Sequence, residues 1–283
     1  MFDFNDSLKN NIQGNTFICA HRGSCGGNVP CNTLAAFNAA LVNGAQMIEL
    51  DVTKSRDGKH FVFHPGMEFP QLHSIIPISA MKASSVEKLR YTNSDHLPTQ
   101  YKVEKLDEVL DFLKGKCYIN VDKFWMDIPG ISEVIRRTGV EKQVVVKAAI
   151  KDKYINSILE CAKDFMFMPI VKNEDTITDM LTAKGINCIG AEVLFKEESA
   201  KVCSDEYIEE MHNKGKILFA NAEVYDYHAV LSAGHTDDIS VAGEPDKGWG
   251  WLIDKGFDII QTDFAGMLKD YITNRGVAYA DIK

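Results

Sequence analysis

The sequence predicts an α/β protein built as a (β/α)8 TIM barrel, with a small insertion after its second strand region. Short apolar runs alternate with amphipathic helical segments through most of the 283 residues. Apolar strands that are each followed by a helix are typical of a parallel sheet covered by helices. About eight such repeats in roughly 250 residues indicate that the sheet closes into a barrel.

The predicted strands are runs rich in β-branched and aromatic residues. They are expected at 16–20, 47–53, 60–63, 117–121, 143–149, 166–171, 186–193, 216–221 and 258–262. The short run 60–63 follows its predecessor closely, so it is interpreted as a hairpin-like return.

The predicted helices lie between these strands and place their apolar residues at helical spacing. They are expected at 33–42, with Asn32 or Thr33 as the N-cap, and at 106–113, 131–137, 153–162, 175–182, 205–213, 248–254 and 266–273. Residues 65–103 are too many for a simple connection, and their apolar helical pieces predict a packed insertion that roofs one side of the barrel mouth. Because no linker divides the chain, residues 1–283 are predicted to form a single domain.

The charge balance restricts the classes of partner. Lys and Arg number 31 against 40 Asp and Glu, a net charge of −9, which argues against broad binding to nucleic acid or to anionic membranes. The N-terminal residues 1–15 lack the features of a signal peptide and no run reaches transmembrane length. The sequence thus predicts a short lead-in, a cytoplasmic location and no stable membrane insertion, and it carries no pattern that indicates an oligomeric state.

The cysteines favour a reduced protein. There are seven, with no Cys-x-x-Cys pair, in a chain large enough to fold without disulfides. Cys19, Cys25 and Cys31 are six residues apart, a spacing that suits no common zinc site. We therefore expect buried free thiols.

Polar side chains collect where the predicted strands end, which is where the active site of such a barrel forms. They are His21, Glu49, Asp51, His64, Asn120, Asp122, Lys147, Glu192, Asn221 and Asp263. Glu49 and Asp51 are two residues apart, so both point to one face of their strand, and Asp122 lies on the neighbouring strand. Three carboxylates suit a hard cation such as Mg²⁺ or Ca²⁺. The alternative, rated equal, is an ion network with Arg22 and Lys123.

Three segments resemble the glycerophosphodiester phosphodiesterase family. The first is AHRGSCGGNVPCNTLAAFNAALVNGAQMIELDVTKSRDGKHFVFH, residues 20–64, which is similar to the family's ordered His-Arg-Gly, Pro-Glu-Asn-Thr, Ile-Glu-x-Asp-Val, Asp-Gly and His-Asp motifs. The others are LDEVLDFLKGKCYINVDK and GFDIIQTDFAGML. The family's fold is a (β/α)8 barrel, which agrees with the strand and helix pattern.

The resemblance implies a role for each matching residue. His21 and His64 would be the acid–base pair, Glu49, Asp51 and Asp122 would hold a divalent cation, and Arg22 would face the substrate phosphate, with Lys123 or Lys147 as further cations. The implied reaction is the metal-dependent hydrolysis of a glycerophosphodiester, a small-molecule substrate, to sn-glycerol 3-phosphate and an alcohol, in which a substrate hydroxyl attacks the phosphorus. Imidazoles suit both proton transfers because they titrate near neutral pH.

The chain departs from the family pattern at four positions. Cys31 stands in place of the Glu of Pro-Glu-Asn-Thr, Pro65 in place of the Asp of His-Asp, and Asp122 in place of a longer carboxylate. Phe124 takes the place of a lysine, with Lys123 one residue early. Lys123 can then reach the phosphate only if the strand has ended or bulged.

Two other functions stay open. The first is a related phosphodiesterase that acts on a lysophospholipid, a phosphosphingolipid or a sugar phosphodiester and releases a cyclic phosphate. The second is a catalytically silent phosphodiester-binding protein, which the changes at Cys31 and Pro65 allow.

Two further groups of residues have simpler interpretations. Trp249 and Trp251 are expected to pack in the core rather than stack on a substrate. His235, Asp237 and Asp238 are expected to form a solvated turn rather than a second metal site. For Asp263, a structural role at the barrel seam is weighed equally with a hydrogen bond across the mouth.

Overall fold

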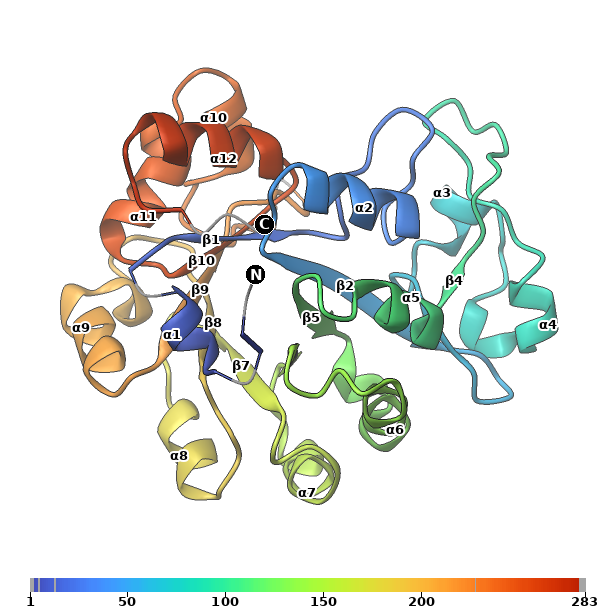
Figure 1. Ribbon diagram of the computed structural model, residues 1–283, viewed down its shortest axis with the longest axis horizontal. Coiled ribbons are helices and arrows are strands. Elements are labelled where there is room, and N and C mark those ends of the chain that lie inside the picture. The colour runs from blue at the N-terminus through green and yellow to red at the C-terminus, as the bar shows by residue number, and fades with distance from the viewer. Residues whose placement is uncertain (1–2, 5, 13, 227, 280–283) are drawn as a thin grey trace.

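The computed structural model describes residues 3–4, 6–12, 14–226 and 228–279, and in these ranges eight parallel strands close into a barrel surrounded by helices (Figure 1). The barrel strands are β1 (Phe17–Ala20), β2 (Met47–Lys54), β5 (Tyr118–Asp122), β6 (Val144–Ala148), β7 (Met166–Lys172), β8 (Gly190–Leu194), β9 (Ile217–Asn221) and β10 (Ile259–Thr262). β1 pairs with both β10 and β2, which closes the sheet. The predicted (β/α)8 barrel is confirmed.

The barrel interior changes from apolar to polar along the strands. Side chains two residues apart share a face of a strand, so β2 places Met47, Glu49 and Asp51 in successive layers inside the barrel. Met47 belongs to an apolar inner cluster with Phe17 and Tyr118, near the amino ends of their strands. The next layers, toward the carboxyl ends, are occupied by the carboxylates.

A short helix, α1 (Leu8–Ile12), packs against the amino-terminal end of the barrel. Leu8 and Ile12 are buried in the inner apolar cluster, and the amide of Asn11 donates a hydrogen bond to the Tyr118 hydroxyl at 2.7 Å. The predicted lead-in therefore contains a helix that the sequence pattern did not indicate, because five residues are too few for a clear helical period. Residues 1–2, 5 and 13 of the lead-in, and residues 280–283, lie outside the described ranges.

The helices around the barrel follow the predicted order. They are α2 (Leu34–Val42), α5 (Leu106–Leu113), α6 (Ile128–Thr138), α7 (Asp152–Cys161), α8 (Thr178–Ala183), α9 (Asp205–Asn213), α11 (Trp251–Lys255) and α12 (Ala265–Asn274). Thr33 is the N-cap of α2 and accepts a hydrogen bond from the Ala36 amide, as one of the two predicted caps. α8 begins three residues later than predicted because the Asp175 carboxylate accepts hydrogen bonds from Ile177 and Thr178 amides and holds a turn there. β8 likewise begins at Gly190 rather than at Ile186.

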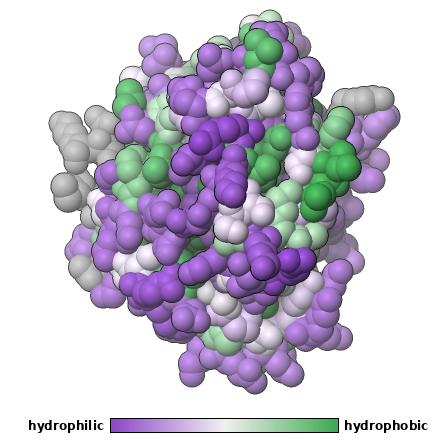
Figure 2. Space-filling view, turned by 90° about the vertical axis from the view of Figure 1, so that its right-hand side faces the viewer, coloured by the Kyte–Doolittle hydropathy of each residue, from purple (hydrophilic) through white to green (hydrophobic). Residues whose placement is uncertain are grey.

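Residues 65–103 form a small layer beside the barrel, seen at the right of Figure 1. The layer contains α3 (Glu68–Leu72), a 3-10 turn (Ile78–Ala80) and α4 (Ala83–Val86), and it packs on a cluster of its own that includes Phe61, Phe63 and Tyr91. Next to this layer, β3 (His60–Val62) pairs antiparallel with the end of β2, and β4 (Glu104–Lys105) pairs antiparallel with β3. Figure 2 views the molecule from this side and shows mostly hydrophilic side chains with scattered apolar ones.

Within the described ranges, no helix is both long enough and apolar enough to cross a membrane.

Gly190 of β8 lies where the neighbouring strand β9 leaves no room for a side chain. A Cβ atom at this position would lie 1.9 Å from the Ile217 carbonyl oxygen of β9. We expect Gly190→Ala to lower the free energy of unfolding by about 1–3 kcal/mol, the usual cost of overpacking a rigid core. Urea denaturation measures it, and Gly266→Ala is the control, because its Cβ would meet Asn43 at an ordinary 3.4 Å in a helix. An unchanged urea midpoint for Gly190→Ala would show that the strands can separate at this point.

Candidate active site

Three carboxylates meet at the carboxyl ends of β2 and β5. Asp51 of β2 lies opposite Asp122 of β5 in the parallel register, and Glu49 lies one layer below. Each of the three offers an oxygen within 4.8 Å of the others; the side chains of Glu49 and Asp51 are buried and that of Asp122 is nearly so. Among the described residues, no hydrogen-bond partner reaches Asp51 Oδ1 or Asp122 Oδ1.

This donor set fits a divalent cation. Buried carboxylate oxygens without partners are costly, and a hard cation bound by oxygen atoms would satisfy them. The mutual repulsion is visible in Glu49, where burial and the nearby charge of Asp51 raise the pKa to about 7. The predicted metal ligands are therefore brought together as one acidic cluster that could hold a metal ion.

Two cations already face the cluster. Arg22 Nε lies 2.9 Å from Asp51 Oδ2, and Lys123 Nζ lies 2.5 Å from Asp122 Oδ2 and 3.4 Å from Asp51 Oδ1. Burial would raise the pKa of Asp51, but Arg22 and Lys123 outweigh it and hold that pKa below its ordinary value. The ion network that the sequence offered as an alternative is thus present together with the carboxylate cluster.

Lys123 reaches the cluster because β5 has ended. The strand stops at Asp122, and Lys123 adopts a left-handed backbone with φ 58°. This turn redirects the side chain, which would otherwise point away from the face that carries Asp122. The sequence required the strand to end or bulge before Lys123 for this side chain to face the site, and the strand does end there.

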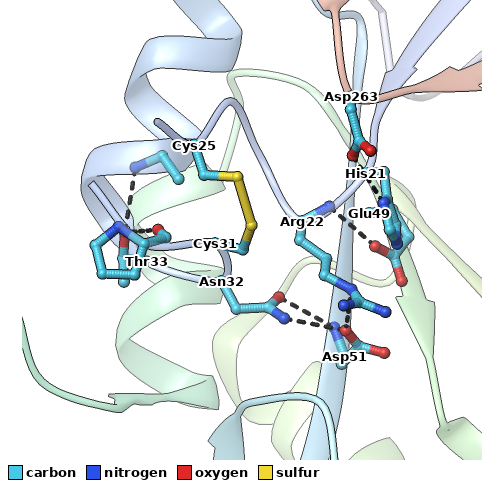
Figure 3. The surroundings of a disulfide bond; sticks show 11 residues. His21, Arg22, Cys25, Cys31, Asn32, Thr33, Glu49, Asp51 and Asp263 are labelled. Atoms are coloured by element: carbon cyan, nitrogen blue, oxygen red, sulfur yellow. Dashed lines mark hydrogen bonds and ion pairs between the residues drawn. A yellow bond between two sulfur atoms is a disulfide. The ribbon is translucent and has the colours of Figure 1, made fainter. Parts of the chain in front are cut away.

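Asn32 is a site residue that the sequence analysis did not assign. Its side-chain amide donates to Asp51 Oδ2 at 3.0 Å, and its carbonyl oxygen accepts from the Asp51 amide at 3.3 Å (Figure 3). Asn32 also has a positive φ of 59°, a conformation that asparagine tolerates better than most residues. Asn32 matches the Asn of the family's Pro-Glu-Asn-Thr motif, and this match is the sequence signal that could have identified it as a site residue.

The expectation that all cysteines are free is wrong for one pair. Cys25 and Cys31 form a disulfide beside Asn32 (Figure 3), because Gly26 and Val29 exchange two backbone hydrogen bonds and fold the loop back on itself. This reversal places the two Cα atoms 5.0 Å apart, within disulfide range. The remaining five cysteines are free thiols, and four of these are buried.

His21 is hydrogen-bonded to a carboxylate. Its Nδ1 lies 2.9 Å from Asp263 Oδ1, at the end of β10 (Figure 3). Burial disfavours the charged imidazole, but this hydrogen bond and the charges of Glu223 and Glu49 outweigh burial and raise the pKa to about 9. His21 is therefore expected to be protonated at neutral pH. Asp263 follows β10 and His21 follows β1, its neighbour where the sheet closes, so this hydrogen bond lies at the barrel seam rather than across the mouth.

His64 lies near Asp51 and Tyr225 and has a different environment. Its Nε2 is 4.0 Å from Asp51 Oδ1, its Nδ1 has no hydrogen-bond partner in the described structure, and its ring centroid is 5.8 Å from that of Tyr225. Burial lowers the pKa of His64, and the charges of Arg22 and Lys123 add to this effect against that of Asp51. The two predicted catalytic histidines thus favour opposite protonation states.

Lys147 is buried in the barrel and paired with a carboxylate. Its Nζ is 3.1 Å from Glu192 Oε2, and Asn221 donates to Glu192 Oε1 at 2.8 Å. The structure pairs Lys147 with Glu192, so direct contact between Lys147 and a phosphate remains a prediction.

Two further buried acids were missed or misassigned. Glu223 accepts a 2.8 Å hydrogen bond from Gln261, and burial raises its pKa to about 8. Asp237, expected in a solvated turn, is 1% exposed and begins a short helix, α10 (Asp237–Val241). That expectation is wrong because Asp237 finds buried donors, among them Trp249, whose predicted place in the core is confirmed.

The fold agrees with the comparisons to known proteins. Residues 21–178, more than half of the chain, match the model of the glycerophosphoryl diester phosphodiesterase family. The chain therefore belongs to this family. Residues 167–272 match a second model, which is described only as a domain of unknown function.

Among curated proteins, a glycerophosphodiester phosphodiesterase of Caldanaerobacter subterraneus subsp. tengcongensis is 31% identical over 145 residues, 47% of this chain and 58% of the relative. An uncharacterized Bacillus subtilis protein, YqiK, is 27% identical over 214 residues, 70% of this chain and 82% of that protein. The match thus spans little more than half of the length of the first relative.

Solved structures share the fold. A glycerophosphoryl diester phosphodiesterase from Parabacteroides distasonis has a TM-score of 0.74 at 18% identity, covering 98% of this chain and 94% of that one. An Oleispira antarctica phosphodiesterase, in complex with its product sn-glycerol-3-phosphate, has a TM-score of 0.68 at 15% identity, covering 93% and 99%. At these identities the likeness establishes the barrel and nothing finer.

Proposed function

We propose that the protein hydrolyses glycerophosphodiesters to sn-glycerol 3-phosphate and an alcohol, with the help of a divalent cation. The observation that carries the proposal is the cluster of Glu49, Asp51 and Asp122, which in the described structure has two oxygens without a hydrogen bond and lies beside Arg22 and Lys123. Two histidines of opposite charge preference lie near it. Membership of the phosphodiesterase family supports the proposal, as does the product bound by the Oleispira antarctica protein.

The cation would be held by Glu49, Asp51 and Asp122. When bound, Mg²⁺ or Ca²⁺ would neutralise charge on the phosphoryl oxygens and help orient the attacking hydroxyl. Arg22 and Lys123 are placed to contribute further positive charge at the same phosphate, since both already face the cluster.

The two histidines would divide the proton transfers. His64, whose pKa burial lowers and whose Nε2 lies 4.0 Å from Asp51 Oδ1, would accept the proton of the substrate's free glycerol hydroxyl. The hydroxyl oxygen then forms a bond to phosphorus, the bond to the alcohol oxygen breaks, and His21 gives its proton to that oxygen. In a second step, His21 takes a proton from water, the water oxygen opens the cyclic phosphate, and His64 returns its proton to the glycerol oxygen.

Choline release from glycerophosphocholine tests this function. We expect turnover with Mg²⁺ or Ca²⁺ and loss of turnover in excess chelator, with sn-glycerol 3-phosphate formed in equal amount. Lysophosphatidylcholine as a parallel substrate, and a search for cyclic phosphate, separate a related lipid phosphodiesterase from the proposed one. No turnover of any diester, together with measurable binding of one, would instead support a catalytically silent binding protein.

A further inference from the structure

Asp237 is a buried carboxylate with an unusual number of hydrogen bonds. Its Oδ1 accepts from Trp249 Nε1 at 2.6 Å and from the Thr262 hydroxyl at 2.7 Å, and its Oδ2 accepts from the Asp263 amide at 2.8 Å. Its own amide donates to the Ala222 carbonyl oxygen at 2.7 Å, just beyond β9. Asp237 therefore joins the segment after β9 to the segment after β10.

Burial of a carboxylate costs free energy unless hydrogen bonds offset the loss of hydration. Burial raises the pKa of Asp237 to about 6, while its hydrogen bonds oppose that rise. A core aspartate usually has a specific task, because an apolar side chain of the same size would pack more cheaply.

One of the Asp237 hydrogen bonds holds Asp263, the residue that is hydrogen-bonded to His21. Asp263, whose amide is held by Asp237, places its own carboxylate 2.9 Å from His21 Nδ1. The Asp263 side chain is 40% exposed, so the solvent side gives it little support. The Thr262 hydroxyl, also held by Asp237, accepts from the Phe264 amide at 2.9 Å. Asp237 thus holds the turn that carries Asp263 through its hydrogen bonds to the Thr262 hydroxyl and the Asp263 amide.

We propose that Asp237 is a positioning residue for the phosphodiesterase reaction: it fixes the Thr262–Asp263 turn so that Asp263 stays hydrogen-bonded to His21. This inference rests on the proposed function only where it concerns turnover. The segment that supplies Asp237 and Trp249, which lies with α11 and α12 beside β10 (Figure 1), falls within the part of the chain that matches the domain of unknown function. That part of the chain would therefore help to position a histidine that lies in the other matched part.

Asp237→Asn is the sharpest variant. The asparagine oxygen can still accept from Trp249 and Thr262, but its NH₂ group cannot accept from the Asp263 amide, so only the link to Asp263 is broken. Asp238→Asn is the matched control, because Asp238 is the next residue in the same turn and is exposed.

Titration of the His21 imidazole by NMR gives a readout that does not need turnover. Four groups act on this imidazole: Asp263, Glu223, Glu49 and Arg22. Loss of the oriented Asp263 partner is expected to lower the pKa of His21 from about 9 toward its ordinary value in Asp237→Asn and in Asp263→Asn, but not in Asp238→Asn. In the double variant, Asp237→Asn should lower it no further than Asp263→Asn alone. An unchanged His21 titration in folded Asp237→Asn, or additive shifts, would overturn the proposal.

Wild-type protein provides a second measurement should Asp237→Asn fail to fold. The amide resonance of Asp263 is expected to shift with a midpoint near pH 6, following protonation of Asp237. An Asp263 amide that does not follow this titration contradicts the link. In the turnover assay, kcat of Asp237→Asn should fall by up to about 100-fold with little change in KM. Inactive wild-type protein would refute the proposed function, yet leave the NMR result to decide the role of Asp237.

Discussion

His21→Ala is expected to lower kcat for glycerophosphocholine by about 10²–10⁴-fold, because the departing choline oxygen then leaves without a proton. In a single turnover, the same variant should release p-nitrophenolate from the p-nitrophenyl diester of glycerol phosphate at close to the wild-type rate, since p-nitrophenolate is stable without protonation. The reason lies in the structure: hydrogen bonding to Asp263 and nearby negative charge keep His21 protonated up to a pKa of about 9.

His64→Ala is the matched comparison. A general base is needed whichever alcohol departs, so this variant should lose comparable activity toward both substrates. The wild-type rate for glycerophosphocholine should also fall as the pH rises through about 9, where His21 loses its proton. Equal losses for both substrates in His21→Ala would show that His21 is not the acid. If His64→Ala instead kept its activity toward the p-nitrophenyl diester alone, the two assigned roles would be reversed.

Asp51→Asn is expected to have an effect of similar size. Asp51 is fully buried and contacts Arg22, Lys123 and Asn32, and it supplies one of the three oxygens of the cluster. Loss of cation binding should remove several kcal/mol of charge stabilisation in the transition state. That corresponds to a fall in kcat/KM on the order of 10³-fold.

Thermal unfolding gives a check of Asp51→Asn without substrate. A ligand that binds only the folded chain raises its midpoint of unfolding, so Mg²⁺ or Ca²⁺ should stabilise the wild-type protein and not the variant. Asp111→Asn, at an exposed position on α5, should keep the wild-type response. A cation-induced increase in Asp51→Asn equal to that of wild type would place the cation elsewhere.

The parts of the site that follow from local rules could be predicted. Strand periodicity alone places Glu49 and Asp51 on one face, and the parallel register brings Asp122 opposite Asp51. The barrel itself follows from the repeated strand and helix pattern, and the family motifs agree with it.

The parts that depend on distant or irregular segments could not be predicted. Asp237 and Asp263 are 26 residues apart and meet only because two loops cross the same end of the barrel. Cys25 and Cys31 pair because the bridge between Gly26 and Val29 reverses the loop. Such a reversal leaves no periodic signal in the sequence, so the disulfide could not be predicted. The pairing of Lys147 with Glu192 depends on where β6 and β8 lie around the closed barrel.

In the proposed function, the cluster of Glu49, Asp51 and Asp122 holds the cation on which diester hydrolysis depends. A single ³¹P NMR time course tests this claim most directly: glycerophosphocholine is incubated with chelator-treated protein, and Mg²⁺ or Ca²⁺ is then added in excess. We predict a constant diester signal before the addition and its conversion to sn-glycerol 3-phosphate afterwards. Conversion at the same rate before and after the addition, or no conversion with either cation, would contradict the claim.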